Sequence, residues 1–187
     1  MSDRPLNFFA LFDLPVGFAI DPEILNARYR DLLAVTHAER LAAADDPDPD
    51  PDASARATRM LDDAYRILRD PLTRAEYLLG LRDDPALPEL AAADGGENGL
   101  IFLMERMELR ETLAEAASCA DPDTAVARVL TQLAEESAAL DKTLQGLFAD
   151  PSPENLRLAR EIVRQLRFLG TCRRDAEDRR PGPPLHD

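Results

Sequence analysis

The apolar residues of this chain recur at the spacing of α-helices, and this periodicity constrains the fold more than any other feature. Side chains three or four positions apart lie on one side of a helix. One such stripe consists of Ala57, Met60, Leu61, Ala64 and Leu68. β-Branched residues are sparse, and no segment alternates apolar and polar residues as a half-buried strand does. The sequence therefore predicts an all-α fold.

Three of the expected helices begin with the same arrangement of residues. An Asp or Ser that can cap the helix is followed by Pro at the first helical position and by an acid in the first turn. These starts are Asp21-Pro22-Glu23, Asp121-Pro122-Asp123 and Ser152-Pro153-Glu154. With the periodicity, they predict helices at about 7–13, 22–41, 53–69, 71–81, 99–118, 122–148 and 153–176.

A segment rich in Pro, Gly and Asp, residues 82–98, has the composition of a linker. It predicts an N-terminal helical domain over residues 1–81 and a three-helix bundle over 99–178, followed by a disordered tail over 179–187. Two leucine-rich seams support the bundle, since they lie on its second and third helices at the spacing of packed helices. The seams comprise Leu130, Leu133, Leu140, Leu144 and Leu147, and Leu156, Ala159, Val163 and Leu166.

The helix expected at 99–118 is apolar on two opposite sides. Phe102, Leu109 and Leu113 form one stripe, which suits the core, while Leu103, Met104 and Met107 lie on nearly the opposite side. Phe168 also points away from its seam, onto a side shared with charged residues. We predict that these four surplus side chains form one exposed patch for a partner, because methionine suits surfaces that repack on binding. For Phe168 alone, an isolated exposed or partly covered aromatic is the alternative.

The charge of the chain argues against several kinds of partner. With 36 acidic and 22 basic side chains, the net charge is −14, which disfavours nucleic acids and anionic membranes. No apolar run approaches the roughly 18 residues of a membrane span, and we expect a cytoplasmic protein. Cys119 and Cys172 are far apart and predict two reduced thiols. We expect no metal site and no cofactor.

An enzymatic interpretation would pair His37 with Glu39 as acid and base. We do not favour it, because no nucleophile or second histidine accompanies them and His186 lies in a proline-rich tail. We therefore expect no catalytic residues and a protein that is not an enzyme.

Several motifs carry a resemblance to a known family. A helix ends in Thr36-His37-Ala38-Glu39-Arg40-Leu41, and the next helix runs through 62–68 into Pro71-Leu72-Thr73-Arg74-Ala75-Glu76-Tyr77-Leu78-Leu79. This arrangement resembles a J-domain, the helical hairpin that stimulates ATP hydrolysis by DnaK-type chaperones. With Phe102-Leu103-Met104-Glu105, Glu108-Leu109-Arg110-Glu111 and Leu166-Arg167-Phe168-Leu169, the chain resembles the HscB family, the J-type co-chaperones of iron–sulfur cluster assembly. The similarity covers about residues 6–176.

The resemblance implies a J-type domain joined to a bundle that carries an iron–sulfur cluster scaffold protein to a specialised DnaK-type chaperone. It assigns scaffold binding to Leu103, Met104, Met107, Glu108, Arg110, Glu111 and Phe168. It assigns chaperone binding to Arg28, Arg30, His37, Ala38, Glu39 and Arg40.

The segment His37-Ala38-Glu39 departs from the family pattern, which has His-Pro-Asp in a loop. Proline fixes φ and removes a donor, so alanine loosens the expected turn, and glutamate moves the charge outward by one methylene. Two functions therefore stay open: a co-chaperone that stimulates a chaperone ATPase, and a degenerate J-protein that binds its client without doing so. The segment Asp45–Asp52, which alternates Asp and Pro, has no assigned role.

Overall fold

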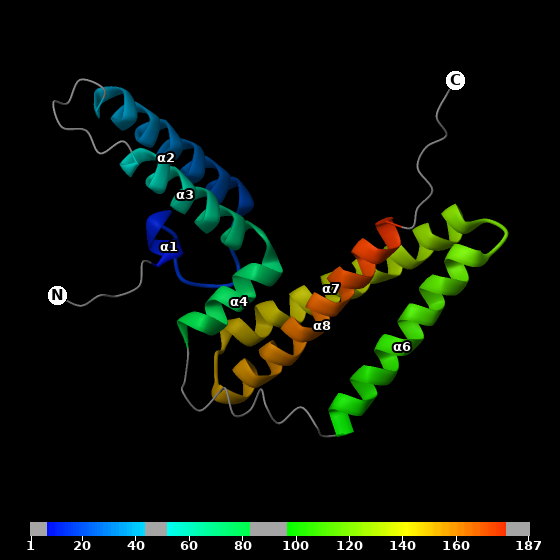
Figure 1. Ribbon diagram of the computed structural model, residues 1–187. Coiled ribbons are helices and arrows are strands. Elements are labelled where there is room, and N and C mark those ends of the chain that lie inside the picture. Colours follow the sequence, from blue (N-terminus) through cyan, green and yellow to red (C-terminus); the bar gives the residue numbers. More distant parts are fainter. Residues whose placement is uncertain (1–6, 44–51, 83–96, 179–187) are drawn as a thin grey trace, which may run out of the picture. The chain divides into compact units, whose positions relative to one another are not determined.

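The chain is entirely helical in its regular structure wherever the computed structural model describes it, namely in residues 7–43, 52–82 and 97–178 (Figure 1). The helices are α1 (Phe8–Leu11), α2 (Pro22–Ala43), α3 (Ala53–Arg69), α4 (Pro71–Leu81), α6 (Glu97–Ser118), α7 (Pro122–Ala149) and α8 (Pro153–Asp178). The all-α prediction is confirmed, and every predicted helix is present with ends within two residues of those expected.

The chain divides into two compact units, Met1–Leu78 and Leu79–Asp187. This division lies inside α4, just before the segment 82–98 that the composition suggests as the linker. The last residues of α4 belong to the second unit, where the guanidinium carbon of Arg82 lies 5.9 Å from the ring centroid of Phe148 on α7. Residues 83–96 and the predicted tail at 179–187 fall outside the described ranges.

In the first unit, α2 and α3 pack together as a hairpin joined by two tyrosines. The rings of Tyr29 and Tyr65 stack with their centroids 4.1 Å apart. The Tyr29 hydroxyl donates to the Asp62 carboxylate at 2.7 Å, and that of Tyr65 donates to Asn26 Oδ1 at 2.6 Å. The hydrogen bond to Asp62 raises the pKa of Tyr29, because ionisation would remove the donor and place two negative charges together.

A buried arginine holds the corner between α3 and α4. Arg74 is 7% exposed, and its guanidinium donates to the carbonyl oxygens of Leu68 (2.6 Å), Arg69 (3.1 Å) and Phe18 (2.6 Å). The same group lies 5.5 Å from the ring centroid of Phe18. Arg74 therefore ties the segment that leads into α2 to the corner of the unit.

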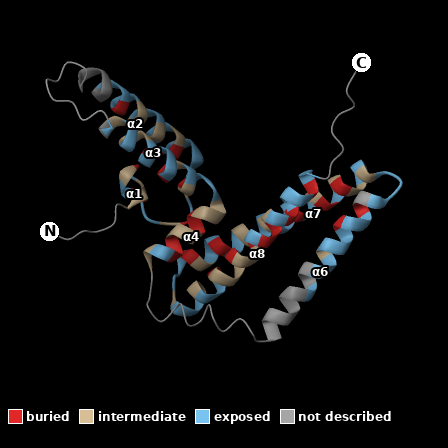
Figure 2. Ribbon diagram, viewed as in Figure 1, coloured by how far each residue is buried: buried red, intermediate tan, exposed pale blue. Residues whose placement is uncertain are grey.

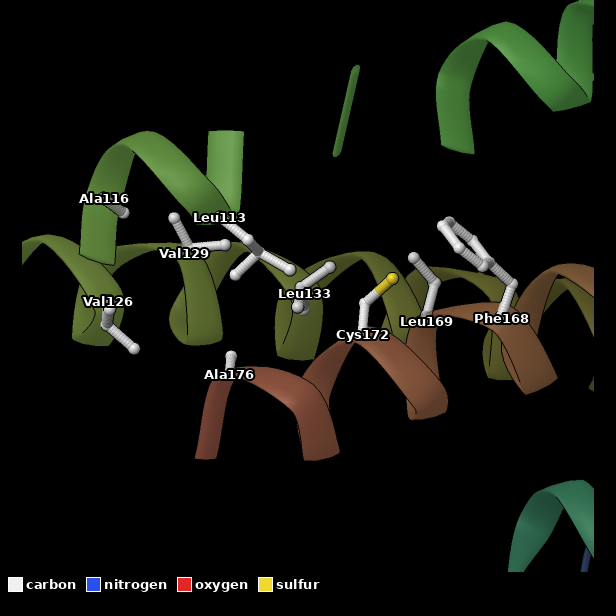
Figure 3. Packing of buried hydrophobic residues seen from close by; sticks show 9 residues of the cluster. All are labelled: Leu113, Ala116, Val126, Val129, Leu133, Phe168, Leu169, Cys172 and Ala176. Atoms are coloured by element: carbon white, nitrogen blue, oxygen red, sulfur yellow. The ribbon is translucent and has the colours of Figure 1, made fainter. Parts of the chain in front are cut away.

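In the second unit, α7 packs along α8, and α6 packs against both (Figure 1). The core between them is drawn in Figure 3 and comprises Leu113, Ala116, Val126, Val129, Leu133, Phe168, Leu169, Cys172 and Ala176. The expected helix start at Asp121 is confirmed, since its carboxylate accepts from the backbone N–H of Thr124 at 3.3 Å. Hydrogen bonding to Thr124, first from its side chain and then from its backbone N–H, lowers the pKa of Asp121. The Ser152 hydroxyl likewise accepts from the N–H of Asn155 at 3.2 Å.

Candidate functional site

The outer side of α6 carries the first candidate site. Leu113 and Ala116 turn inward and are 5% and 9% exposed, whereas Met104 and Met107 are 55% and 57% exposed. The prediction of a helix with a core stripe and a second, unburied apolar stripe is therefore confirmed for these two methionines. The side chain of Leu103 lies outside the described residues.

The predicted charged residues of this site lie around the methionines. Glu108, Arg110 and Glu111 are all exposed along the same helix. The part of α6 whose burial is described is drawn mostly in the exposed colour in Figure 2. Glu108 follows Met104 by four positions and Glu111 follows Met107 by four, so each carboxylate neighbours a methionine on the helix surface. We call these residues, Met104, Met107, Glu108 and Glu111, the outer face of α6. This face combines apolar contact area with acceptors of hydrogen bonds.

Phe168 does not belong to this exposed face, and its predicted exposure is wrong. The side chain is 8% exposed and lies in the core of the bundle, on α8 beside Leu169 and Cys172 (Figure 3). The buried side of α8 changes along the helix. The seam through Leu166 is followed by a second buried stripe, Phe168, Cys172 and Ala176, which packs in one cluster with residues of α6 and α7. The spacing of four in that stripe is the sequence signal for its burial.

The second candidate site is the segment His37-Ala38-Glu39, which lies inside α2 and not in a loop. The helix continues from Pro22 to Ala43. Ala38 has the highest helix propensity of any residue and keeps the N–H that proline lacks, so nothing here interrupts the ladder of backbone hydrogen bonds. His37 and Ala38 are exposed, and the side chains of Glu39 and Arg40 lie outside the described residues.

The two predicted arginines of this site lie on different sides of α2. Two positions on a helix are about 200° apart, so Arg28 and Arg30 cannot form one patch. Arg28 lies toward the segment before α2, where its guanidinium pairs with the Asp13 carboxylate at 3.2 Å. Arg30 and His37 are seven positions apart and share a side, and Arg30 Nε donates to the Asn26 carbonyl oxygen at 3.3 Å. The structure thus groups Arg30 with His37 and separates Arg28 from them.

Two further observations concern membranes and metals. Of the helices in the described ranges, none combines the length and the apolarity of a membrane span. The described His, Cys, Asp and Glu side chains form no group of three that could hold a metal ion. Cys119 is exposed and Cys172 is buried, and neither of these two described thiols is in a disulfide.

A J-like helical hairpin in one unit and a three-helix bundle with an exposed apolar face in the other define a class of helical proteins that act through interaction surfaces. Residues 100–177 match a family model described as "HSCB C-terminal oligomerisation domain". The co-chaperone protein HscB homolog of Vibrio cholerae serotype O1 (strain O395) is 33% identical over 172 residues, which cover 92% of this chain and 95% of that protein. That of Shewanella baltica (strain OS195) is 33% identical over 165 residues, which cover 88% and 91%. The chain belongs to the HscB co-chaperone family.

Solved structures agree with this assignment. The chaperone HscB from Vibrio cholerae superposes with a TM-score of 0.73 at 32% identity, covering 92% of this chain and 96% of that one. The human co-chaperone protein HscB superposes with a TM-score of 0.66 at 21% identity, covering 97% and 88%, and supports the fold alone. The predicted J-type domain and C-terminal helical bundle are thereby confirmed.

Proposed function

We propose that this protein is a cytoplasmic co-chaperone that delivers an iron–sulfur cluster scaffold protein to a DnaK-type chaperone and stimulates its ATPase. The observation that carries the proposal is the outer face of α6, where Met104 and Met107 are more than half exposed on a helix whose other side is already packed. Membership of the HscB family supports the choice of partners.

The energetics indicate that the scaffold must cover more than the two methionines. Covering their exposed portions contributes about 2–3 kcal/mol in total, which is less than the cost of association at roughly 4–15 kcal/mol. Leu103, Glu108, Arg110 and Glu111 therefore belong to the proposed interface as well. In this proposal Phe168 supports the interface from the core of the bundle, because its position keeps α8 packed against its neighbours.

Calorimetric titration with the scaffold protein from the same cell tests scaffold binding. Replacing Met104 and Met107 together by alanine should raise the Kd at least tenfold and leave the Tm nearly unchanged, since both side chains lie outside the core. Met60 on α3 is 38% exposed and supplies the matched control, because Met60→Ala removes an exposed methionine from the other unit. Undiminished binding by the double variant would remove the outer face of α6 from the interface.

A second candidate function, a degenerate J-protein that binds its client without stimulating ATP hydrolysis, is favoured by the uninterrupted α2 helix. The family resemblance expects a turn at His37-Ala38-Glu39, and this chain forms helix there. A single-turnover ATPase assay with the DnaK-type chaperones of the same cell separates the two candidates. Stimulation by the native protein would exclude the degenerate one.

The double variant Ala38→Pro with Glu39→Asp extends this assay by restoring the turn. Proline inside a helix costs about 3 kcal/mol and disfavours helix at the residue before it, so α2 should end near His37 and the far-UV circular dichroism should weaken. If the protein is a working co-chaperone, ATPase stimulation should rise about tenfold, as for one charge-assisted hydrogen bond. Ala38→Gly is the control, because it loosens the helix without fixing φ. No stimulation by the native protein or by the double variant would refute the co-chaperone proposal.

A further inference from the structure

The two exposed methionines of α6 are also sites of oxidation chemistry. They lie three positions apart, so their thioethers are neighbours on the helix surface, and they are 55% and 57% exposed. The chain has four methionines, and the other one that the structure describes, Met60, is less exposed at 38%. The two most exposed of the described methionines thus coincide with the apolar part of the outer face of α6.

Peroxide converts an accessible thioether into a sulfoxide in one balanced step. A lone pair of the methionine Sδ attacks one oxygen of hydrogen peroxide, an S–O bond forms as the O–O bond breaks, and the second oxygen leaves as water after a proton shift. The sulfur loses two electrons and the peroxide gains them. The product is a polar, chiral side chain in place of a flexible apolar one, and methionine sulfoxide reductases reverse the change.

We propose that Met104 and Met107 form a redox-sensitive site whose oxidation to sulfoxide releases the scaffold protein, an inference that rests on the proposed function. The sulfoxide oxygen is a strong acceptor that must lose its water when the face is covered. The neighbouring carboxylates of Glu108 and Glu111 are acceptors too, so they cannot bond to it. Arg110 is a donor, but it follows Met107 by three positions and Met104 by six, so it can neighbour only one of the two sulfoxides. Oxidative stress would thereby stop the delivery of scaffold without unfolding the bundle, because neither methionine lies in the core.

The test uses the full chain treated with hydrogen peroxide, followed by catalase and desalting, so that the scaffold never meets the oxidant. Dithiothreitol then returns any oxidised Cys119, the exposed thiol, to its reduced form, because it reduces disulfides and sulfenic acids but not sulfoxides. Peptide mass mapping locates the added oxygen atoms, and calorimetric titration measures scaffold binding. We expect the Kd to rise at least tenfold, equivalent to about 1.4 kcal/mol, and to recover after treatment with methionine sulfoxide reductases A and B.

Leucine variants identify the sulfur atoms that matter. Replacing both Met104 and Met107 by leucine keeps the apolar volume and removes both sulfur atoms, so the Kd of this variant, whatever its value, should be the same before and after peroxide treatment. Met60→Leu is the matched control and should stay sensitive. Binding that survives confirmed oxidation of both methionines would overturn this inference alone, as would a double leucine variant that stays peroxide-sensitive. Absence of scaffold binding by the untreated protein would instead refute the proposed function, and this inference with it.

Discussion

Replacing Phe168 by alanine tests the assignment of this residue to the core against its assignment to an exposed binding face. The side chain is 8% exposed and belongs to the cluster that joins α6, α7 and α8 (Figure 3). An aromatic side chain deleted from such a position leaves a cavity in addition to losing its own burial. We therefore expect the variant to be destabilised throughout the bundle and not only altered at its surface.

The expected loss of stability follows from the burial of the Phe168 side chain. Phe→Ala substitutions in cores cost about 3–5 kcal/mol, and Phe168 should fall near the lower value because it retains slightly more exposure than Cys172, which is 1% exposed. A loss of about 3 kcal/mol is a large part of the roughly 5–15 kcal/mol that stabilises a typical domain. It corresponds to a decrease in Tm of about 12–24 °C for a domain of this size.

The distribution of tyrosines allows the two units to be followed separately. All three tyrosines, Tyr29, Tyr65 and Tyr77, lie in the first unit, and the chain has no tryptophan. Near-UV circular dichroism of tyrosine in urea therefore reports the first unit, while far-UV circular dichroism reports the helices of both. In Phe168→Ala, a far-UV transition should move to lower urea while the tyrosine transition stays in place. Leu158→Ala, on the same helix at 37% exposure, is the control and should cost about 1 kcal/mol or less.

One combination of results would refute this reasoning. If Phe168→Ala leaves both transitions unchanged and abolishes scaffold binding, the side chain contacts the scaffold directly and its place in the core is wrong. A large loss of stability with scaffold binding preserved in the folded fraction would establish a purely structural role.

Two further predictions concern the first unit. Arg74→Met removes three hydrogen bonds to carbonyl oxygens and should lower the free energy of unfolding of the first unit by at least ~3 kcal/mol. The shift of the tyrosine transition in urea measures this loss. A loss below about 1 kcal/mol would contradict the role of Arg74 at the corner between α3 and α4. The raised pKa of Tyr29 means that its bond to Asp62 stabilises the fold fully below the ordinary pKa near 10 and loses this effect as pH rises through the raised value. The difference between absorbance titrations of the native protein and Tyr29→Phe isolates this group, and Asp62→Asn should lower its pKa; an unchanged midpoint would show that the bond is absent in solution.

Most of the fold could be predicted because its determinants are local in sequence. The helix starts at Asp121 and Ser152 depend on side chains that cap the backbone three residues later, and the structure contains those bonds. The stripe along Leu133 and Leu144 depends on periodicity within one helix, and both residues are buried. The buried and exposed sides of α6 could likewise be predicted, because Met104 and Leu113 differ in their position around a single helix axis.

The burial of Phe168 could not be predicted in this way because it depends on which helices meet which part of α8. A periodicity fitted through Val163 and Leu166 treats the helix as having one buried side along its length. The described structure has a second buried stripe through Cys172, in the region that packs against α6 as well as α7. Covering by a third helix is a tertiary property, and a single-helix pattern gives only a weak signal of it.

The segment at His37 aligns with a family motif but does not have the turn that the family pattern has there. The family pattern has a turn at His37-Ala38-Glu39, while the periodicity of this chain predicts helix over 22–41, and the structure has helix there. The scaffold-binding half of the proposed function depends on the surface of a helix that the sequence specifies by itself. The chaperone-stimulating half is assigned by the family resemblance to His37-Ala38-Glu39, a segment that is helical in this chain. The two halves should therefore be separable by mutation: substitutions at Met104 and Met107 should leave ATPase stimulation without scaffold unchanged, and substitutions at Ala38 should leave scaffold affinity unchanged.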